Sequence, residues 1–196
     1  MAEALIGGHG KPAAPLGGAR FGGPPAVEEM PQRGMIAVRC DLETDALRDA
    51  VSSAIGVAAP ERLSIRRGEG GLAAWMSPDE LLLIVPSERL AGTLSDMSGR
   101  LGKGALVADV SDMRATFRLS GPGARDVLAK LVPLDLSREG FGPDAFRRTR
   151  LAQVAAAIWT EEGGDGFEVV TMRSHARYAF DLLSNAARHG SLGFHR

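Results

Sequence analysis

The chain has 196 residues, of which 44% are hydrophobic and 24% are charged, and its formal net charge is -1. This length and composition predict one compact domain with an ordinary hydrophobic core. The near-neutral charge and an aromatic content of 5% exclude both a phosphate-neutralising stripe and a base-stacking platform, so we expect no nucleic-acid partner. No run approaches the roughly 20 apolar residues that span a bilayer, so we expect no membrane association.

Cysteine and histidine usage argues against a metal centre and against a disulfide framework. Cys40 is the single cysteine and ends an apolar run, so we expect it to pack as a small hydrophobic residue. The four histidines lack ligand-like spacing, and we interpret His175 as part of a helix start rather than as a catalytic partner of Ser174. No signal peptide is recognised, which makes a cytoplasmic location the simplest expectation.

The first 33 residues differ in composition from the rest of the chain. Gly and Pro dominate residues 1–33 and no apolar period emerges, so this segment is predicted to be an extended or disordered arm. Scattered apolar residues would allow the arm to order against a partner, namely Leu5, Ile6, Leu16, Phe21 and Val27. Residues 34–196 are predicted to form a single compact domain with two related halves, at about 35–104 and 105–190.

Apolar periodicity predicts strands, hairpins and helices in alternation from residue 35 onward. The first half is predicted to contain strands at 35–41, 62–67, 72–76 and 81–85, and helices at 44–55 and 87–99. The second half is predicted to contain strands at 105–110, 115–119, 151–160 and 167–172, helices at 122–132 and 176–188, and a polar connector at 133–148. Thr44 and Ser174 are candidate helix N-caps. This order predicts an α+β fold, with two related antiparallel or mixed sheet units and helices packed on them.

Two glycine-rich segments are candidate phosphate loops, and neither completes a nucleotide-binding fingerprint. Arg67–Gly71 precedes a strand rather than a helix. Gly121–Ala124 does open a predicted helix, although Pro122 removes one backbone donor there. The acidic segment Glu161–Gly166 is interpreted as a solvated hairpin turn rather than as a pair of catalytic carboxylates.

Two segments resemble the folate-binding domain of the glycine-cleavage T-protein family. In residues 108–131 a strand that ends in Ser120–Pro122 leads into a helix, and in residues 158–170 a hairpin carries Asp165–Glu168 ahead of the last helix. The element order agrees over about residues 35–190. Within this superfamily, the short length and the segment Trp75–Ile84 resemble the gamma subunits of heterotetrameric sarcosine oxidases.

The resemblance implies a non-catalytic gamma subunit that supports assembly of the flavin-bearing subunits. The implied complex performs the oxidative demethylation of sarcosine to glycine, formaldehyde or methylene-tetrahydrofolate, and hydrogen peroxide. Its alpha, beta and delta subunits would be the partners of this chain. The resemblance places FAD, FMN, NAD, tetrahydrofolate and zinc on those other subunits, with no cofactor bound by this chain alone and no catalytic or metal-binding residue assigned to it.

One candidate ligand site also follows from the resemblance. In the T-protein family the Glu of the Asp-Gly-Phe-Glu hairpin helps to hold the pterin, which makes Glu168 and the aromatic Trp159 the candidates for a vestigial folate site. The hairpin tip here is longer than in the family, and we find neither the family's catalytic Asp motif nor its C-terminal barrel domain. A structural role for Glu168 is therefore favoured. The alternative function is a free-standing, folate-dependent aminomethyltransferase-like protein.

Overall fold

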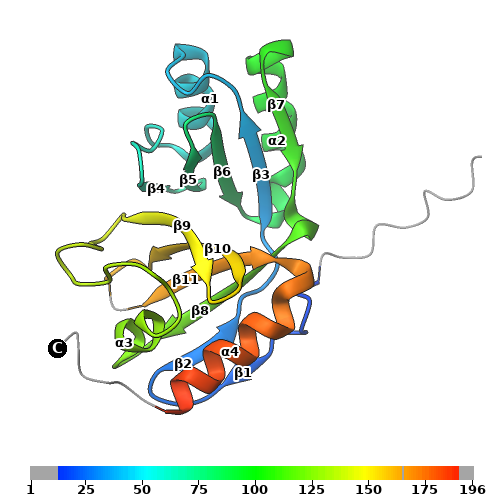
Figure 1. The fold of residues 1–196 in the computed structure, drawn as a ribbon. Helices are drawn as coiled ribbons and strands as arrows, with labels where there is room; N and C mark the ends of the chain where they lie inside the picture. Colours follow the sequence, from blue (N-terminus) through cyan, green and yellow to red (C-terminus); the bar gives the residue numbers. More distant parts are fainter. Residues whose placement is uncertain (1–12, 165, 190–196) are drawn as a thin grey trace, which may run out of the picture.

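A computed structural model describes residues 13–164 and 166–189, and two antiparallel sheets form its centre (Figure 1). The six-stranded sheet has the order β1 (Arg20–Phe21), β2 (Ala26–Glu29), β8 (Arg114–Ser120), β11 (Phe167–Met172), β10 (Val154–Thr160) and β9 (Phe146–Leu151). The five-stranded sheet has the order β4 (Ile65–Gly68), β5 (Gly71–Ser77), β6 (Glu80–Val85), β3 (Gly34–Arg39) and β7 (Leu106–Asp109). The predicted α+β class, with antiparallel sheets, is confirmed.

The helices pack against the outer faces of the two sheets, which gives four layers. Helices α1 (Asp45–Ile55) and α2 (Leu90–Leu101) share a hydrophobic cluster with the five-stranded sheet. Helices α3 (Ala124–Ala129) and α4 (Ala176–Arg188) share another with the six-stranded sheet. A third cluster fills the space between the sheets and includes Met35, Ala74, Leu82, Phe146, Trp159 and Val170. Burial on both faces explains why the sequences of β3, β5, β6 and β10 are nearly continuous apolar runs.

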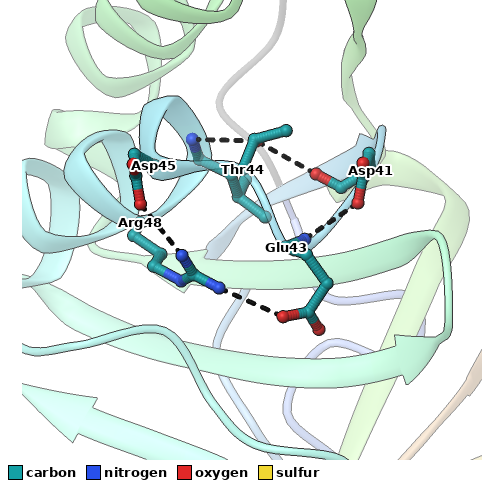
Figure 2. Close-up of polar contacts among 6 residues, drawn as sticks. Asp41, Glu43, Thr44, Asp45 and Arg48 are labelled. Atoms are coloured by element: carbon teal, nitrogen blue, oxygen red, sulfur yellow. Dashed lines mark hydrogen bonds and ion pairs between the residues drawn. The ribbon is translucent and has the colours of Figure 1, made fainter.

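The start of α1 follows the predicted capping chemistry (Figure 2). The Thr44 hydroxyl oxygen accepts a hydrogen bond from the Leu47 N–H at 3.4 Å, and the same hydroxyl donates to the Asp41 carbonyl at 3.1 Å. The Arg48 guanidinium then joins two acidic neighbours, Glu43 at 3.1 Å and Asp45 at 2.9 Å. These contacts satisfy an otherwise free backbone donor of the first turn and fix where the helix begins.

The N-terminal segment does not follow the predicted boundary after residue 33. Strand β2 pairs with β8, and Val27, opposite Leu119, is fully buried. The buried Glu29 carboxylate accepts hydrogen bonds from the backbone of Leu16 at 2.9 Å and Gly18 at 2.7 Å, which ties the preceding residues to the sheet. The sequence gives no period here because the strand is short and half polar. Of the predicted anchors, Leu5 and Ile6 lie outside the described residues.

The sheets also cross the predicted boundary between the two halves. Strand β7 of the second predicted half pairs with β3, whereas β2 joins the sheet of the second half. Strand β9 begins inside the predicted connector 133–148, and the strand predicted at 151–160 is divided by a turn at Ala152. Ala152 has a φ of 50°, without the Gly or Asn that usually marks such a turn.

Several helix details differ from the predictions as well. Helix α3 is shorter than the predicted span 122–132. Ser174 lies within a 3-10 turn, Arg173–His175, and His175 occupies the cap position of α4 without a side-chain hydrogen bond. Among the described residues, no helix combines the length and apolar character needed to cross a bilayer.

Candidate functional site

A cavity of about 640 Å³ opens between the two sheets at one end of the inter-sheet core. The five-stranded sheet contributes apolar walls, including Leu72 and Ile84, together with Arg67 of β4, and the six-stranded sheet contributes charged side chains, including Arg118 and Glu168. The ionisable lining consists of three arginines and three glutamates: Arg33, Arg67, Arg118, Glu161, Glu162 and Glu168. The cavity is therefore mixed in polarity and balanced in formal charge.

Strand register arranges the candidate residues in one row across the six-stranded sheet. Successive partner positions are Arg20, Glu28, Arg118, Glu168, Trp159 and Phe146. Directly opposed residues of antiparallel strands project from the same face. The register thus makes Trp159 and Glu168 neighbours, as expected for two residues of one site, and aligns Arg118 with them.

Trp159 belongs to the core rather than to the cavity wall. Its side chain is fully buried and stacks on Phe146 with ring centroids 6.2 Å apart and planes inclined by 23°. The indole Nε1 is buried and finds no hydrogen-bond partner among the described residues. Of the two predicted site residues, the structure therefore brings only Glu168 to the cavity.

The carboxylate of Glu168 is engaged by an arginine of the same chain. Arg33, in the segment between β2 and β3, forms an ion pair with Glu168 through Nη2 and Oε2, and its Nη1 lies 3.5 Å from Oε1. Both side chains are largely buried, with 27% of Arg33 and 11% of Glu168 exposed. A guanidinium fork thus faces both oxygens of the carboxylate. Any other paired N–H donor would have to compete with Arg33 for the same two acceptors.

The two remaining arginines of the cavity and Glu161 also have internal partners. Arg118 forms an ion pair with Glu161, whose side chain is only 18% exposed. Burial raises the pKa of Glu161, the nearby Arg118 opposes that rise, and Glu168 adds to it. Arg67 donates to the Asp144 carboxylate at 2.8 Å and to a backbone carbonyl of β10.

The interpretation of Glu161 as part of a solvated turn is therefore wrong for its side chain. Its backbone N–H bonds to the Gly166 carbonyl at 2.9 Å and closes the hairpin. A Cβ atom at Gly166 would lie 2.2 Å from the Glu161 carboxylate, so the absence of a side chain there lets the carboxylate lie against the sheet. The paired arginine offsets part of the cost of burying this charge.

The glycine-rich segment Arg67–Gly71 serves close packing rather than phosphate binding. A Cβ atom at Gly68 would lie 2.0 Å from the Ile55 carbonyl oxygen, and one at Gly70 would lie 2.2 Å from that of Ala54. Only glycine permits this approach of β4 to the end of α1.

Sequence reasoning identified Glu168 but missed Arg33, Arg67 and Arg118. The alternation of Arg118 with Phe117 and Leu119 predicts a solvent-facing arginine, whereas both faces of β8 are covered. Arg33 lies in the segment expected to be an arm, and its partner is 135 residues away. Over residues 13–164 and 166–189, no group of three His, Cys, Asp or Glu side chains is arranged to hold a metal ion.

Comparison with known proteins gives a consistent set of relatives. The family described as GCVT N-terminal domain matches residues 69–193. The sarcosine oxidase subunit gamma of Corynebacterium sp. (strain P-1) is 30% identical over 144 residues, which cover 70% of this chain and 68% of the relative. A chain of the heterotetrameric sarcosine oxidase from Corynebacterium sp. U-96, in complex with pyrrole 2-carboxylate, has a TM-score of 0.75 and 26% identity, covering 87% of this chain and 88% of that chain.

A more distant structure shares the fold. The glycine cleavage system aminomethyltransferase T from Bartonella henselae has a TM-score of 0.58 at 19% identity, and the match covers 79% of this chain but 44% of that chain. The resemblance read from residues 108–131 and 158–170 is thereby confirmed. The chain belongs to the family of sarcosine oxidase gamma subunits, built on the fold of the GCVT N-terminal domain.

Proposed function

We propose that this chain is the non-catalytic gamma subunit of a heterotetrameric sarcosine oxidase and supports assembly of its flavin-bearing subunits. The observation that carries the proposal is the match of 87% of the chain to a chain of such a complex, with a TM-score of 0.75. In this proposal the alpha, beta and delta subunits are its partners, and the assembled complex works in the cytoplasm.

The chemistry of the complex then belongs to the other subunits. They would hold FAD, FMN, NAD, tetrahydrofolate and zinc, and would demethylate sarcosine oxidatively to glycine, formaldehyde or methylene-tetrahydrofolate, and hydrogen peroxide. Fold alone does not carry an activity, so the non-catalytic role needs an argument from the residues of the site.

The Arg33–Glu168 ion pair supports the non-catalytic role. A pterin would have to displace Arg33 from a carboxylate that is 11% exposed, and would leave a guanidinium without its partner. Trp159 offers no ring face to the cavity because it stacks inside the core. We therefore propose that Glu168 and Trp159 are structural residues at the place where the T-protein family binds folate.

Co-purification tests the assembly role. All four subunits would be expressed together with an affinity tag on this chain, and we expect the tagged chain to retain the other three in a complex with sarcosine oxidase activity. The isolated chain should show no oxidase turnover. Elution of this chain alone, while the other three subunits form an active complex, would contradict the proposal.

Calorimetric titration with tetrahydrofolate tests the alternative, an aminomethyltransferase-like protein. We expect no binding by the isolated chain, whereas the alternative requires micromolar binding that is lost in Glu168→Gln. Arg20→Gln is a matched control, because Arg20 lies in the same row but its side chain is 75% exposed. Binding that needs Glu168 but not Arg20 would favour the alternative.

A further inference from the structure

A second opening between the sheets lies at the other end of the inner face and carries an excess of positive charge. Its cavity of about 150 Å³ is lined by the side chains of Arg114 and Arg148 and by Glu80, over a floor of alanines from β10. Strand register places both arginines on the inner face of the sheet, with Arg114 half-buried and Arg148 exposed at the opening: Arg114 lies four residues before Arg118 on β8, and Arg148 lies two residues after Phe146 on β9. Even spacing along a strand keeps side chains on one face.

Arg114 has no partner of its own. No hydrogen bond or ion pair joins its guanidinium to any of the described residues, and its Nε is buried. Within residues 13–164 and 166–189, Arg148 donates only to the Met76 carbonyl, at 3.3 Å. Burial lowers the pKa of Arg114, the neighbouring Arg148 lowers it further, and Glu80 opposes the shift. In the part of the chain that the structure describes, Glu80 is the carboxylate that stands near these two guanidinium groups.

Glu80 does not neutralise the positive charge of the two arginines in this cavity. It is the one carboxylate that lines this cavity, and its Oε2 also lies 4.0 Å from the Nε of Arg39. Because Arg39 also pairs with Asp79 at 3.0 Å, Glu80 is the acidic side chain that Arg114 and Arg148 share, whereas each arginine of the larger cavity has an acidic partner to itself. A buried donor without a partner is costly, so an anion that accepts from the Arg114 Nε would be stabilised here, with the exposed Arg148 guanidinium beside it.

We propose that Arg114 and Arg148 form a binding site for a single carboxylate group. A planar guanidinium fork matches the two oxygens of a carboxylate. Pockets for drug-sized ligands measure about 300–1,000 Å³, so a cavity of about 150 Å³ admits a head group rather than a larger molecule. The carboxylate comes either from an acidic side chain of a partner subunit or from a small carboxylic acid in solution.

The isolated full-length chain tests the site directly, independently of the proposed function. Sodium acetate would be titrated against sodium chloride at equal ionic strength while the 15N–1H signal of Arg114 Nε and the melting temperature are followed. We expect a saturable shift of the signal and a rise in melting temperature with acetate alone. A linear response, or the same response to chloride, would overturn the site.

Matched variants locate the response. Arg114→Gln should weaken acetate binding by about tenfold or more, since it removes a charge-assisted hydrogen-bond donor. Arg148→Gln should do the same and serves if Arg114→Gln does not fold. Arg150→Gln is the control, because Arg150 donates to the carbonyls of Ala152 and Gln153 at 3.4 and 3.0 Å. Equal loss of binding in all three variants would contradict the assignment to Arg114 and Arg148.

The purified four-subunit complex distinguishes the two sources of the carboxylate. A partner side chain in the site would make the complex unresponsive to acetate, and Arg114→Gln would then reduce retention of this chain in the complex. A small acid as the ligand would leave the saturable acetate response intact in the complex. Failure of the complex to form would count against the proposed function. The carboxylate site would then be tested by the acetate titration of the isolated chain alone.

Discussion

Removal of the Arg33 guanidinium measures how tightly the N-terminal segment is held to the cavity. Arg33→Met keeps most of the aliphatic stem but leaves Glu168, 11% exposed, without its partner. Breaking a buried pair from one side costs about 3–5 kcal/mol, and a surface pair contributes about 0–1 kcal/mol. Because 27% of the Arg33 side chain is exposed, we expect an intermediate loss of about 2 kcal/mol in the free energy of unfolding.

Urea denaturation followed by tryptophan fluorescence gives the measurement, and a double-mutant cycle isolates the pair. Glu168→Gln in the Arg33→Met background removes the unpaired charge, so the double variant should be more stable than Arg33→Met alone. Arg20→Met is the control, since its 3.8 Å contact with Glu28 is exposed and should contribute less than about 1 kcal/mol. Equal stability of Arg33→Met and the wild type, or strict additivity in the cycle, would refute the reasoning.

Three further changes test other parts of the structure. Gly68→Ala should lower the free energy of unfolding by about 1–3 kcal/mol in urea titrations, because its Cβ would lie 2.0 Å from a carbonyl oxygen of α1. The control is Gly92→Ala, within α2 and with no atom near the new Cβ, which should raise the free energy of unfolding by about 0.5–1 kcal/mol. Thr44→Ala should cost about 1 kcal/mol by the same assay, since it removes the acceptor for the Leu47 N–H. The pKa of Glu161 is raised in the folded state above its ordinary value of 4.5. At pH values just above 4.5 the native state therefore binds more protons than the unfolded state, so the free energy of unfolding should fall as the pH rises through this range. The pH profile of Glu161→Gln should lack this decline, and parallel profiles would contradict the assignment.

The elements that sequence predicts well are those whose own residues decide them. The β5–β6 hairpin and β11 are long apolar runs that need burial in any context, and α4 has the predicted bounds Ala176–Arg188. Strands β2 and β9 escape prediction because both are rich in charged residues. Strand β2 depends on β8, a partner far away in sequence, and local pattern cannot reveal such a ladder. Strand β9 pairs with the next strand, β10, through a tight turn at Ala152 that carries neither Gly nor Asn as a turn signal.

The residues of the candidate site also fall into those that the sequence predicts and those that it does not. The position of Glu168 follows from the hairpin motif, and its cross-strand partner Trp159 follows from the register of that hairpin. The arginines of the cavity depend on long-range geometry: Arg33 comes from the segment before β3, and Arg118 faces inward only because a second sheet covers β8. A pattern of alternating polar residues cannot distinguish an open face from one that a second sheet covers.

The two ends of the inter-sheet space differ in how their charges are compensated. At the end with Glu168, each half-buried arginine has an acidic partner, so a ligand there must compete with an existing ion pair. At the end with Arg114, positive charge exceeds negative charge and the space is too small for more than a head group. Because an unpaired buried charge gains more from a new partner than a paired one, binding of an acidic group should favour the Arg114 end. This distribution is what we expect of a non-catalytic subunit. The carboxylates of Glu161 and Glu168 are held in ion pairs, and the Arg114 guanidinium is left to bind an acidic group.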